Sequence, residues 1–256
     1  MRAEGGALET SDDAVLGGRL LLRQPLRGHR IGHDAILLAA ATGARAGERA
    51  VDLGAGVGAA GLALALRVGG LAVTLAEIDP ALCALAAGNA ERNRLSDRVR
   101  AVALDVTEKA AFDAAGLSSA SADRVLMNPP FNDPSHASPD ARRRLAYAAS
   151  ADTLPRWVDA AAHLLKADGV LTLIWRADGQ VQIMQALAPA FGSLAVLPVY
   201  PREGAPAIRV LVRAVKGGGA ATRELAGLAL NDGQGRPTAA AEAVLRGGST
   251  LPMAEF

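Results

Sequence analysis

The sequence contains one cysteine, few aromatic residues, no long apolar run and no excess of either charge. The single cysteine, Cys83, excludes an internal disulfide and a thiolate-rich metal site, so we expect no bound metal. No run approaches the roughly 18 apolar residues of a membrane-spanning helix, which predicts no membrane partner. The 27 basic and 26 acidic residues give a formal charge of +1, which excludes a nucleic-acid binder that relies on bulk charge. Any basic surface must therefore be local.

The beginning of the chain, Met1-Arg2-Ala3-Glu4, lacks the basic and then apolar order of a secretory signal. Together with the single cysteine, this start predicts a reducing, cytoplasmic setting. Half of the 256 residues are hydrophobic, but only four phenylalanines, two tryptophans and two tyrosines are present. The predicted core is therefore mostly alanine, leucine and valine, and the length predicts one domain of generous size, with or without an extension.

From Arg49 onward, strand-like apolar runs alternate with helix-like runs, which is the pattern of a parallel sheet covered by helices. The predicted strands are residues 49–53, 71–76, 99–104, 123–127 and 170–175, and then 194–199 and 207–214, which are close enough to pair antiparallel. The predicted helices are residues 34–41, 59–68 and 180–188, one from 79–80, one from 138–140, and one from 152–155 that ends at 166–169. Residues 1–13 are small and acidic and predict a frayed terminus. Three glycines at 217–219 predict a flexible joint before a tail with a strand near 223–230 and a helix near 238–246.

Gly56, Gly58 and Gly61 lie between the first predicted strand of the sheet and its helix. Glycines here let the backbone turn sharply and approach a ligand closely, while helix amide groups point into the crevice. Glu77 ends the second strand, 19 residues after Gly58, where a carboxylate can bind ribose hydroxyls. This pattern fits both a nicotinamide dinucleotide and S-adenosylmethionine, and glycine-rich turns also occur for packing alone.

Two more carboxylates follow strand ends. Asp105 comes after the third strand, where it can accept a hydrogen bond from the exocyclic amine of an adenine or cap a helix that begins near Thr107. Both interpretations stay open. Asp79 precedes Pro80, and this pair is better explained as a helix cap and first-turn proline than as a ligand site.

Asn128, Pro129, Pro130 and Phe131 follow the predicted strand 123–127. Proline lacks an amide hydrogen and biases the preceding residue toward extended geometry, so these carbonyl groups are not used by secondary structure. The Asn128 side-chain oxygen and the Pro129 carbonyl can grip the hydrogens of an aromatic amine and aim its lone pair at a methyl group. Phe131 can stack on the planar base. The tetrapeptide therefore predicts amino-group methylation, and a turn that only ends a strand is the alternative.

The glycine loop, the acidic strand ends and the Asn-Pro-Pro-Phe tetrapeptide resemble class I S-adenosylmethionine-dependent methyltransferases of the amino-methylating kind. Segments 28–39, 87–93 and 230–238 are similar to those of bacterial tRNA adenine-N6 methyltransferases, which act on the adenine beside the anticodon of a valine tRNA. The resemblance implies an α/β, Rossmann-like, seven-stranded and mostly parallel sheet with helices on both faces and an antiparallel last strand. It also implies three parts. They are an N-terminal segment with a lid helix over the cofactor (1–48), a methyltransferase core (49–215) and a tail packed on the core (216–256).

The resemblance further implies roles for individual residues. The implied S-adenosylmethionine-binding residues are Asp52, Gly54, Ala55, Gly56, Gly58, Glu77, Ile78, Asp105, Val106, Asn128, Arg30, His33 and Asp34. The implied catalytic residues are Asn128, Pro129, Pro130 and Phe131. Helix capping is the alternative explanation for Asp34.

Candidate RNA contacts follow the tetrapeptide closely: His136, Arg142, Arg143 and Arg144. A solvated charge run is the alternative explanation for the three arginines. His29 and His33 are four apart but lack a third ligand, so zinc is not expected. We expect the two tryptophans, Trp157 and Trp175, in the core.

The predicted function is methyl transfer to the exocyclic N6 of an adenine in tRNA, next to the anticodon, with tRNA as partner. An unpaired loop base suits this chemistry because its extrusion costs only a few kcal/mol. Guanine-N2 methylation of ribosomal RNA and glutamine-N5 methylation of a protein stay open within the enzyme class. Outside it, the alternatives are an NAD-dependent oxidoreductase and a catalytically silent RNA-binding module. The sequence does not indicate which oligomeric state the protein adopts.

Overall fold

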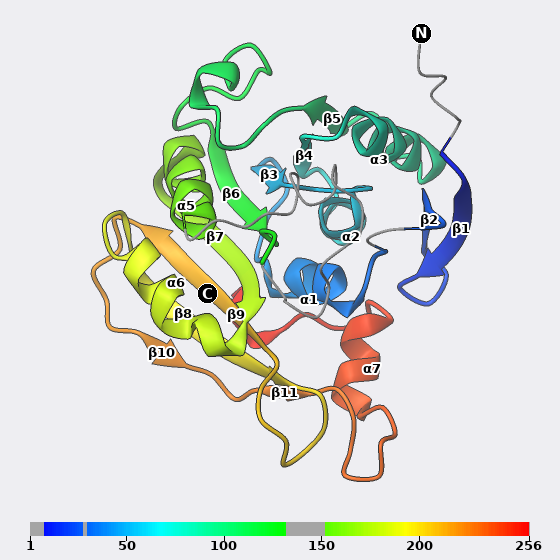
Figure 1. Ribbon diagram of the computed structural model, residues 1–256, viewed down its shortest axis with the longest axis vertical. Coiled ribbons are helices and arrows are strands. Elements are labelled where there is room, and N and C mark those ends of the chain that lie inside the picture. Colours follow the sequence, from blue (N-terminus) through cyan, green and yellow to red (C-terminus); the bar gives the residue numbers. More distant parts are fainter. Residues whose placement is uncertain (1–7, 28–29, 132–151, 256) are drawn as a thin grey trace, which may run out of the picture.

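The computed structural model describes residues 8–27, 30–131 and 152–255, which form a two-stranded hairpin and a nine-stranded sheet with helices on both faces (Figure 1). The strands are β1 (Thr10–Val15), β2 (Leu20–Pro25), β3 (Arg49–Leu53), β4 (Ala72–Glu77), β5 (Val99–Ala103), β6 (Ala122–Met127), β7 (Leu165–Arg176), β8 (Phe191–Tyr200), β9 (Arg209–Lys216), β10 (Arg223–Glu224) and β11 (Leu228–Ala229). The α-helices are α1 (His33–Ala41), α2 (Ala59–Arg67), α3 (Pro80–Arg92), α5 (Thr153–Leu164), α6 (Gln180–Leu187) and α7 (Ala239–Leu245). Within these ranges, no helix has the length and hydropathy needed to cross a membrane.

The large sheet has the order β10-β8-β9-β7-β6-β3-β4-β5, and β11 also pairs with β8. Strands β3 to β7 run parallel, whereas β9 is antiparallel to both of its neighbours, β7 and β8. The prediction of an α/β fold with a mostly parallel sheet and a reversed last strand is therefore confirmed. The two additional strands, β10 and β11, have two residues each and extend the sheet parallel to β8.

Two hydrophobic clusters lie on the two faces of the sheet. Helices α1, α2 and α3 pack on one face and α5 and α6 on the other, as Figure 1 shows. Helix α5 illustrates why the sequence folds this way, because Leu154, Trp157, Val158, Ala161 and Leu164 recur at helical spacing and are all buried. Alanine supplies much of the opposite cluster, so α1 and α2 approach the sheet closely. The expectation of a core poor in aromatic residues is met.

Strand β1 begins at Thr10, so the predicted frayed terminus at residues 1–13 is wrong over residues 10–13. Strand β1 pairs antiparallel with β2 through a turn at Gly17 and Gly18, both with positive φ. Leu20 and Leu22 alternate with exposed residues and are fully buried. A strand with one apolar face needs a surface to cover it, and the hairpin finds that surface on α3 and α2.

The acidic residues that suggested a solvated terminus instead bind arginines on neighbouring elements. Asp12 pairs with Arg23 on β2 at 2.9 Å and with Arg92 on α3 at 3.3 Å, while Asp13 pairs with Arg30 at 2.8 Å. Hydrogen bonds from Arg23 lower the pKa of the Asp12 carboxyl. These side chains are open to solvent, so water screens the pairs and they contribute little to stability.

Two asparagines, one in α3 and one that caps its C-terminus, bind the hairpin to the rest of the fold. Asn89 and Asn93 lie four residues apart, on one face of the helix. Asn89 exchanges two hydrogen bonds with the Arg23 backbone (2.7 and 3.0 Å), and Asn93 does the same with Leu21 (2.9 and 2.7 Å). The Asn89 amide also donates to the Val57 carbonyl at 3.0 Å. Since Val57 belongs to the glycine-rich loop, one buried side chain joins β2, α3 and that loop.

The last part of the chain packs against α1. Leu251 and Met253 are buried in the same cluster as α1, and the Leu251 amide donates to the Ala40 carbonyl at 2.9 Å. On the other side, the Arg19 guanidinium of the β1–β2 turn donates to the carbonyls of Arg246 and Gly247 after α7. Segments from both ends of the sequence therefore meet beside α1.

Two predicted helix boundaries are wrong. Helix α5 ends at Leu164 and β7 starts at once, so the residues expected to end the helix at 166–169 are strand. A shift in the β6–β7 register absorbs them, with Asp168 at a positive φ. No α-helix begins near Thr107. A short 3-10 helix, Lys109–Ala111, stands there instead.

Replacing Asn89 with alanine should lower the free energy of unfolding by at least about 2 kcal/mol, because each buried group left without a partner costs roughly 1–3 kcal/mol. Asn89 is 1% exposed and serves three backbone groups. Urea unfolding measures the change, and Glu91→Ala, on the exposed side of the same helix, is the control. Equal stability of the two variants would contradict the assigned role.

Candidate active site

The sheet register brings the predicted site residues to one edge. Leu53 at the end of β3 is paired with Met127 of β6 on one side and with Ala76 of β4 on the other, and Glu77 is paired with Ala103 of β5. The residues that follow these strand ends are therefore neighbours along the carboxyl edge: Gly54 after β3, Asn128 after β6 and Asp105 after β5. Crevices at this edge are where open α/β sheets bind ligands.

The glycine-rich loop after β3 depends on three glycines with positive φ: Gly54 at +67°, Gly56 at +58° and Gly58 at +89°. A Cβ at Gly54 would collide with the Trp157 ring, and one at Gly58 would lie 2.9 Å from Leu75 Cδ1. These two glycines thus let the loop pack on the core. A Cβ at Gly56 would meet nothing within 4 Å, so this glycine faces open space. The loop combines two packed turns with one exposed backbone segment that a ligand can approach.

Glu77 holds the exposed turn in place. Its side chain is 6% exposed, with Oε2 accepting a hydrogen bond from the Gly56 amide at 2.8 Å and Oε1 accepting one from the Asp79 amide at 2.9 Å. Each carboxylate oxygen keeps a further lone pair for a ligand hydroxyl. Asp79 caps α3 through the amides of Ala81 and Leu82, which confirms its interpretation as a helix cap.

Asp52 holds the other end of the loop. It is 2% exposed, and its Oδ2 accepts a hydrogen bond from the Gly61 amide in the first turn of α2 at 2.8 Å. Burial raises the pKa of this carboxyl from 3.8 to about 7, against the Gly61 hydrogen bond, and the Glu77 charge adds to the rise. The structure thus uses Asp52 inside the fold, and its predicted contact with the cofactor stays a prediction.

The third strand end carries Asp105, which is half-buried. Its Oδ1 accepts hydrogen bonds from the Thr107 amide and hydroxyl, both at 2.8 Å. Among the described residues its Oδ2 has no hydrogen-bonding partner and remains for a ligand amine. Val106 beside it is 5% exposed, whereas Ile78, at the end of β4, is 54% exposed and offers an apolar surface.

The Asn-Pro-Pro-Phe tetrapeptide begins where β6 ends. Asn128 is half-buried and Pro129 is buried. The Phe131 ring contacts the Trp175 ring at a centroid distance of 5.5 Å and an angle of 70°, and the guanidinium carbon of Arg209 lies 5.0 Å from its centroid. Both tryptophans are core residues as expected, with Trp157 8% and Trp175 6% exposed, but Trp175 also touches the tetrapeptide.

Sequence reasoning missed Arg209. It reaches the site because β9 returns antiparallel to β7 and pairs Arg209 with Arg176 at the end of that strand. Its Nε donates to Asp34 Oδ2 at 2.8 Å. No local motif surrounds Arg209, so only the β7–β9 register could have revealed it.

The three residues predicted to form the lid differ in their surroundings. Arg30 donates to both Asp13 carboxylate oxygens, at 3.0 and 2.8 Å, and to Ser11 Oγ at 3.0 Å, so it serves the hairpin. His33 begins α1 and is exposed, and Asp34 turns to Arg209 without capping α1. The candidate RNA contacts His136, Arg142, Arg143 and Arg144 lie outside the described residues, as does His29. In the described ranges, no three His, Cys, Asp or Glu side chains gather as metal ligands would.

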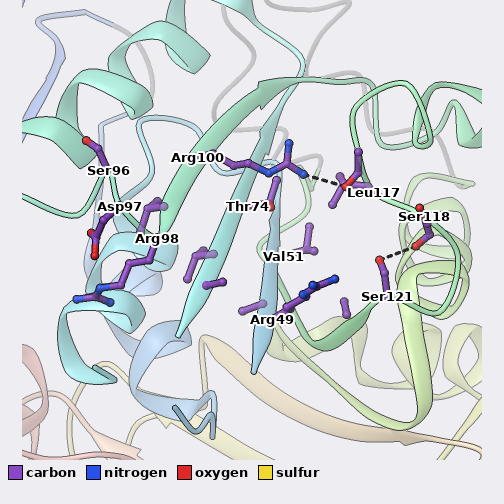
Figure 2. A pocket seen from close by; sticks show the side chains of 16 residues that line it. Arg49, Val51, Thr74, Ser96, Asp97, Arg98, Arg100, Leu117, Ser118 and Ser121 are labelled. Carbon is purple, nitrogen blue, oxygen red and sulfur yellow. Dashed lines mark hydrogen bonds between the residues drawn. The ribbon is translucent and has the colours of Figure 1, made fainter. Parts of the chain in front are cut away.

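Two cavities open on the face of the sheet that carries α5. One of about 870 Å³ lies between α5, α6 and the end of β7, with Phe131 and Trp175 in its wall. The other, of about 490 Å³, lies at the amino ends of β3, β4 and β5 and has Arg100 at one end and Arg49 at the other (Figure 2). It is at the opposite end of these strands from Gly56 and Asn128, and so it is separate from the predicted crevice.

The fold, the glycine loop and the acidic strand ends define a class I S-adenosylmethionine-dependent methyltransferase architecture. Residues 30–199 match the model of the family described as "Methyltransferase small domain", and the chain belongs to this family. The recognition of the family from the sequence is confirmed. S-adenosylmethionine is therefore the cofactor, and the open turn at Gly56 with the free lone pairs of Glu77 and Asp105 fits it.

Named relatives point to more than one acceptor. The release factor glutamine methyltransferase of Chlorobaculum tepidum is 30% identical over 59% of this chain. The matched region spans about half (53%) of that relative's length. The tRNA1(Val) (adenine(37)-N6)-methyltransferase of Bacteroides fragilis is 27% identical over 72% of this chain and 76% of its own length. Among solved structures, a predicted O-methyltransferase from Agrobacterium tumefaciens is 30% identical with a TM-score of 0.73, covering 85% of this chain and 98% of that one.

Gly54→Ala should destabilise the protein by on the order of 3 kcal/mol, since it places a Cβ at positive φ and against Trp157. Gly69→Ala is the matched control, because a Cβ at Gly69 would meet nothing within 4 Å and the φ of this residue is not positive. Thermal unfolding of both variants measures the difference. A Gly54→Ala protein as stable as Gly69→Ala would mean that the loop does not pack as described.

Asp52 should make stability fall as pH rises from about 4 to about 7. Between these pH values the folded protein, in which the pKa of Asp52 is raised, holds a proton that the unfolded chain has released. The contribution of Asp52 to stability is therefore largest near pH 4 and is lost as the pH rises to about 7. Asp52→Asn keeps an oxygen for the Gly61 amide and removes the titration.

The melting temperature of Asp52→Asn should therefore rise relative to that of the wild type as the pH increases from 4 to 8. Glu203→Gln, an exposed neutralisation, is the control. Parallel pH profiles for wild type and Asp52→Asn would refute the assignment.

Proposed function

We propose that this protein transfers the methyl group of S-adenosylmethionine to the exocyclic N6 of an adenine in tRNA, next to the anticodon. The observation that carries the proposal is the adjacency of the tetrapeptide to the cofactor loop, since Met127 and Leu53 are paired residues of β6 and β3. A nitrogen held by Asn128 would thus be close to a ligand held at Gly54 to Gly58. Relatives named as tRNA adenine-N6 methyltransferases support the choice of acceptor.

The residues present can do the work that methylation of an aromatic amine requires. Such a nitrogen is a weak nucleophile, because its lone pair is delocalised into the ring. In the proposal, the Asn128 side-chain oxygen and the Pro129 carbonyl accept hydrogen bonds from the amine and favour a pyramidal nitrogen. The described residues donate no hydrogen bond to the Pro129 carbonyl, so this acceptor is available.

S-adenosylmethionine supplies an electrophilic methyl group when bound, so the protein has to supply position and electrostatics. We propose that Glu77 binds the ribose hydroxyls, that the Gly56 turn carries the chain of the cofactor, and that Asp105 Oδ2 accepts from the adenine amine. Each of these groups borders the same edge of the sheet.

The acceptor is tested by incubating the protein with labelled S-adenosylmethionine and separate pools of unmodified tRNA, ribosomal RNA and cell protein. Nucleoside and amino-acid analysis then identifies the product. We expect N6-methyladenosine from tRNA. N2-methylguanosine from ribosomal RNA or N5-methylglutamine from protein would overturn the acceptor assignment and keep the methyltransferase. Glutamine has specific support as the second candidate, because the relative of 30% identity is a glutamine methyltransferase.

Two further outcomes would overturn the proposal at its root. Stabilisation by NAD and not by S-adenosylmethionine in a thermal-shift assay would favour an oxidoreductase. Binding of tRNA without label transfer to any acceptor would favour a catalytically silent RNA-binding module.

Asn128→Ala should lower kcat by about 10²-fold or more, because one of the two acceptors that orient the amine is lost. Steady-state methyl transfer measures the change, and calorimetric binding of S-adenosylhomocysteine shows whether the cofactor site persists. Gln234→Ala, an exposed amide on the loop before α7, is the control. Activity of Asn128→Ala within a few fold of the wild type would refute the catalytic role.

A further inference from the structure

The ring of Phe131 is held by two groups that come from different strands. Trp175 at the end of β7 meets it at 70°, and Arg209 at the start of β9 stacks its guanidinium 5.0 Å from the ring centroid. The β7–β9 pairing fixes the backbone positions of Trp175 and Arg209 relative to one another, since Trp175 is paired with Val210 and Arg176 with Arg209. Phe131 therefore lies against a rigid part of the sheet, although it belongs to a loop.

The Arg209 guanidinium is itself fixed in orientation. Its Nε donates to Asp34 Oδ2 at 2.8 Å and its Nη1 donates to the Ile208 carbonyl at 3.0 Å. Arginine can satisfy two acceptors in its plane and still present its flat face to a ring, which lysine cannot do. Asp34 lies in the first turn of α1, so Arg209 joins α1 to the tetrapeptide.

An ordinary ion pair is the simplest explanation of Asp34 and Arg209, and burial weighs against a large structural role. Both side chains are 27% exposed, and pairs with such access to water contribute little to stability. By contrast, Arg124 and Glu48, at 16% and 19% exposure, form a more enclosed pair away from the site. What distinguishes Arg209 is its second contact, with the aromatic ring of the loop that follows β6.

We propose that Arg209 is a positioning residue for the acceptor: it fixes the ring plane of Phe131 so that a planar group, an adenine in the proposed function, stacks there with its amine at Asn128. Asp34 supports it by fixing the guanidinium. The guanidinium also covers one face of the ring, so the acceptor uses the face that remains. This inference deepens the proposed function, and rests on it for the identity of the base.

The test is the kinetics of Arg209→Gln, Arg209→Lys, Asp34→Asn and the double variant, on whichever acceptor the wild type methylates. We expect Arg209→Gln to raise KM for the acceptor by about 10-fold, with kcat reduced far less, and to leave the Kd for S-adenosylhomocysteine unchanged. Arg209→Lys should recover only part of the loss, because it keeps the charge without the planar contact. The double variant should be no worse than Arg209→Gln, since Asp34 acts through Arg209.

Arg202→Gln is the matched control, because Arg202 is an exposed arginine of the loop between β8 and β9. Acrylamide quenching of tryptophan fluorescence adds a readout that needs no acceptor. Freeing Phe131 should expose Trp175 in Arg209→Gln and leave quenching unchanged in Arg202→Gln.

An unchanged acceptor KM in Arg209→Gln would overturn the inference, and so would unchanged quenching. A variant in which kcat, cofactor affinity and melting temperature all fall together would overturn it too, because Arg209 would then have a purely structural role. Failure of the proposed function is a different result. If the wild type methylates glutamine, the adenine assignment falls, while the Arg209 variants still report on positioning with that acceptor.

Discussion

Two buried carboxylates hold the glycine-rich loop of this protein in place. Asp52 accepts a hydrogen bond from the Gly61 amide, and Glu77 accepts one from Gly56, so both ends of the glycine-rich loop are held by side chains of the strands beneath. Burial disfavours the charged form of such a carboxyl and raises the pKa of Asp52 to about 7, and the charge of Glu77 adds to this rise. The loop is fixed before a ligand arrives, because Gly54 and Gly58 adopt positive φ without strain and pack against the core.

The elements that position the site come from far apart in the sequence. Asn89 ties the loop carbonyl of Val57 to β2, and Arg209 ties α1 to Phe131 across 175 residues. The Asn89 hydrogen bonds are buried and the Arg209 ion pair is partly exposed, and each connects a loop to a helix or strand. The glycine-rich loop and the tetrapeptide thus follow paired strands of one sheet. Methyl transfer depends on this kind of shared frame, since misplacement by about 1 Å can cost 10²-fold in rate.

The central part of the fold could be predicted from the sequence, because strands buried on both faces and alanine-rich helices follow local periodicity. The hairpin could not, since Asp12 and Asp13 resemble a solvated terminus until Arg23, Arg30 and α3 are placed beside them. The predicted end of α5 is wrong for a related reason: residues 166–169 have turn-forming composition, and the structure places them in β7 at a shift in the β6–β7 register. At the site, strand-end residues follow from topology, whereas Arg209 depends on an antiparallel register that no local pattern encodes.

The packing of residues 251–255 on α1 has a consequence for biosynthesis. Leu251 and Met253 complete the cluster around a helix that leaves the ribosome more than 200 residues earlier, and the Leu251 amide binds the Ala40 carbonyl. Until they emerge, the part of α1 that these residues cover is exposed in the nascent chain. The hydrophobic cluster around α1 is therefore completed late in synthesis. A polypeptide that ends shortly before residue 251 would expose part of this cluster to chaperones and proteases.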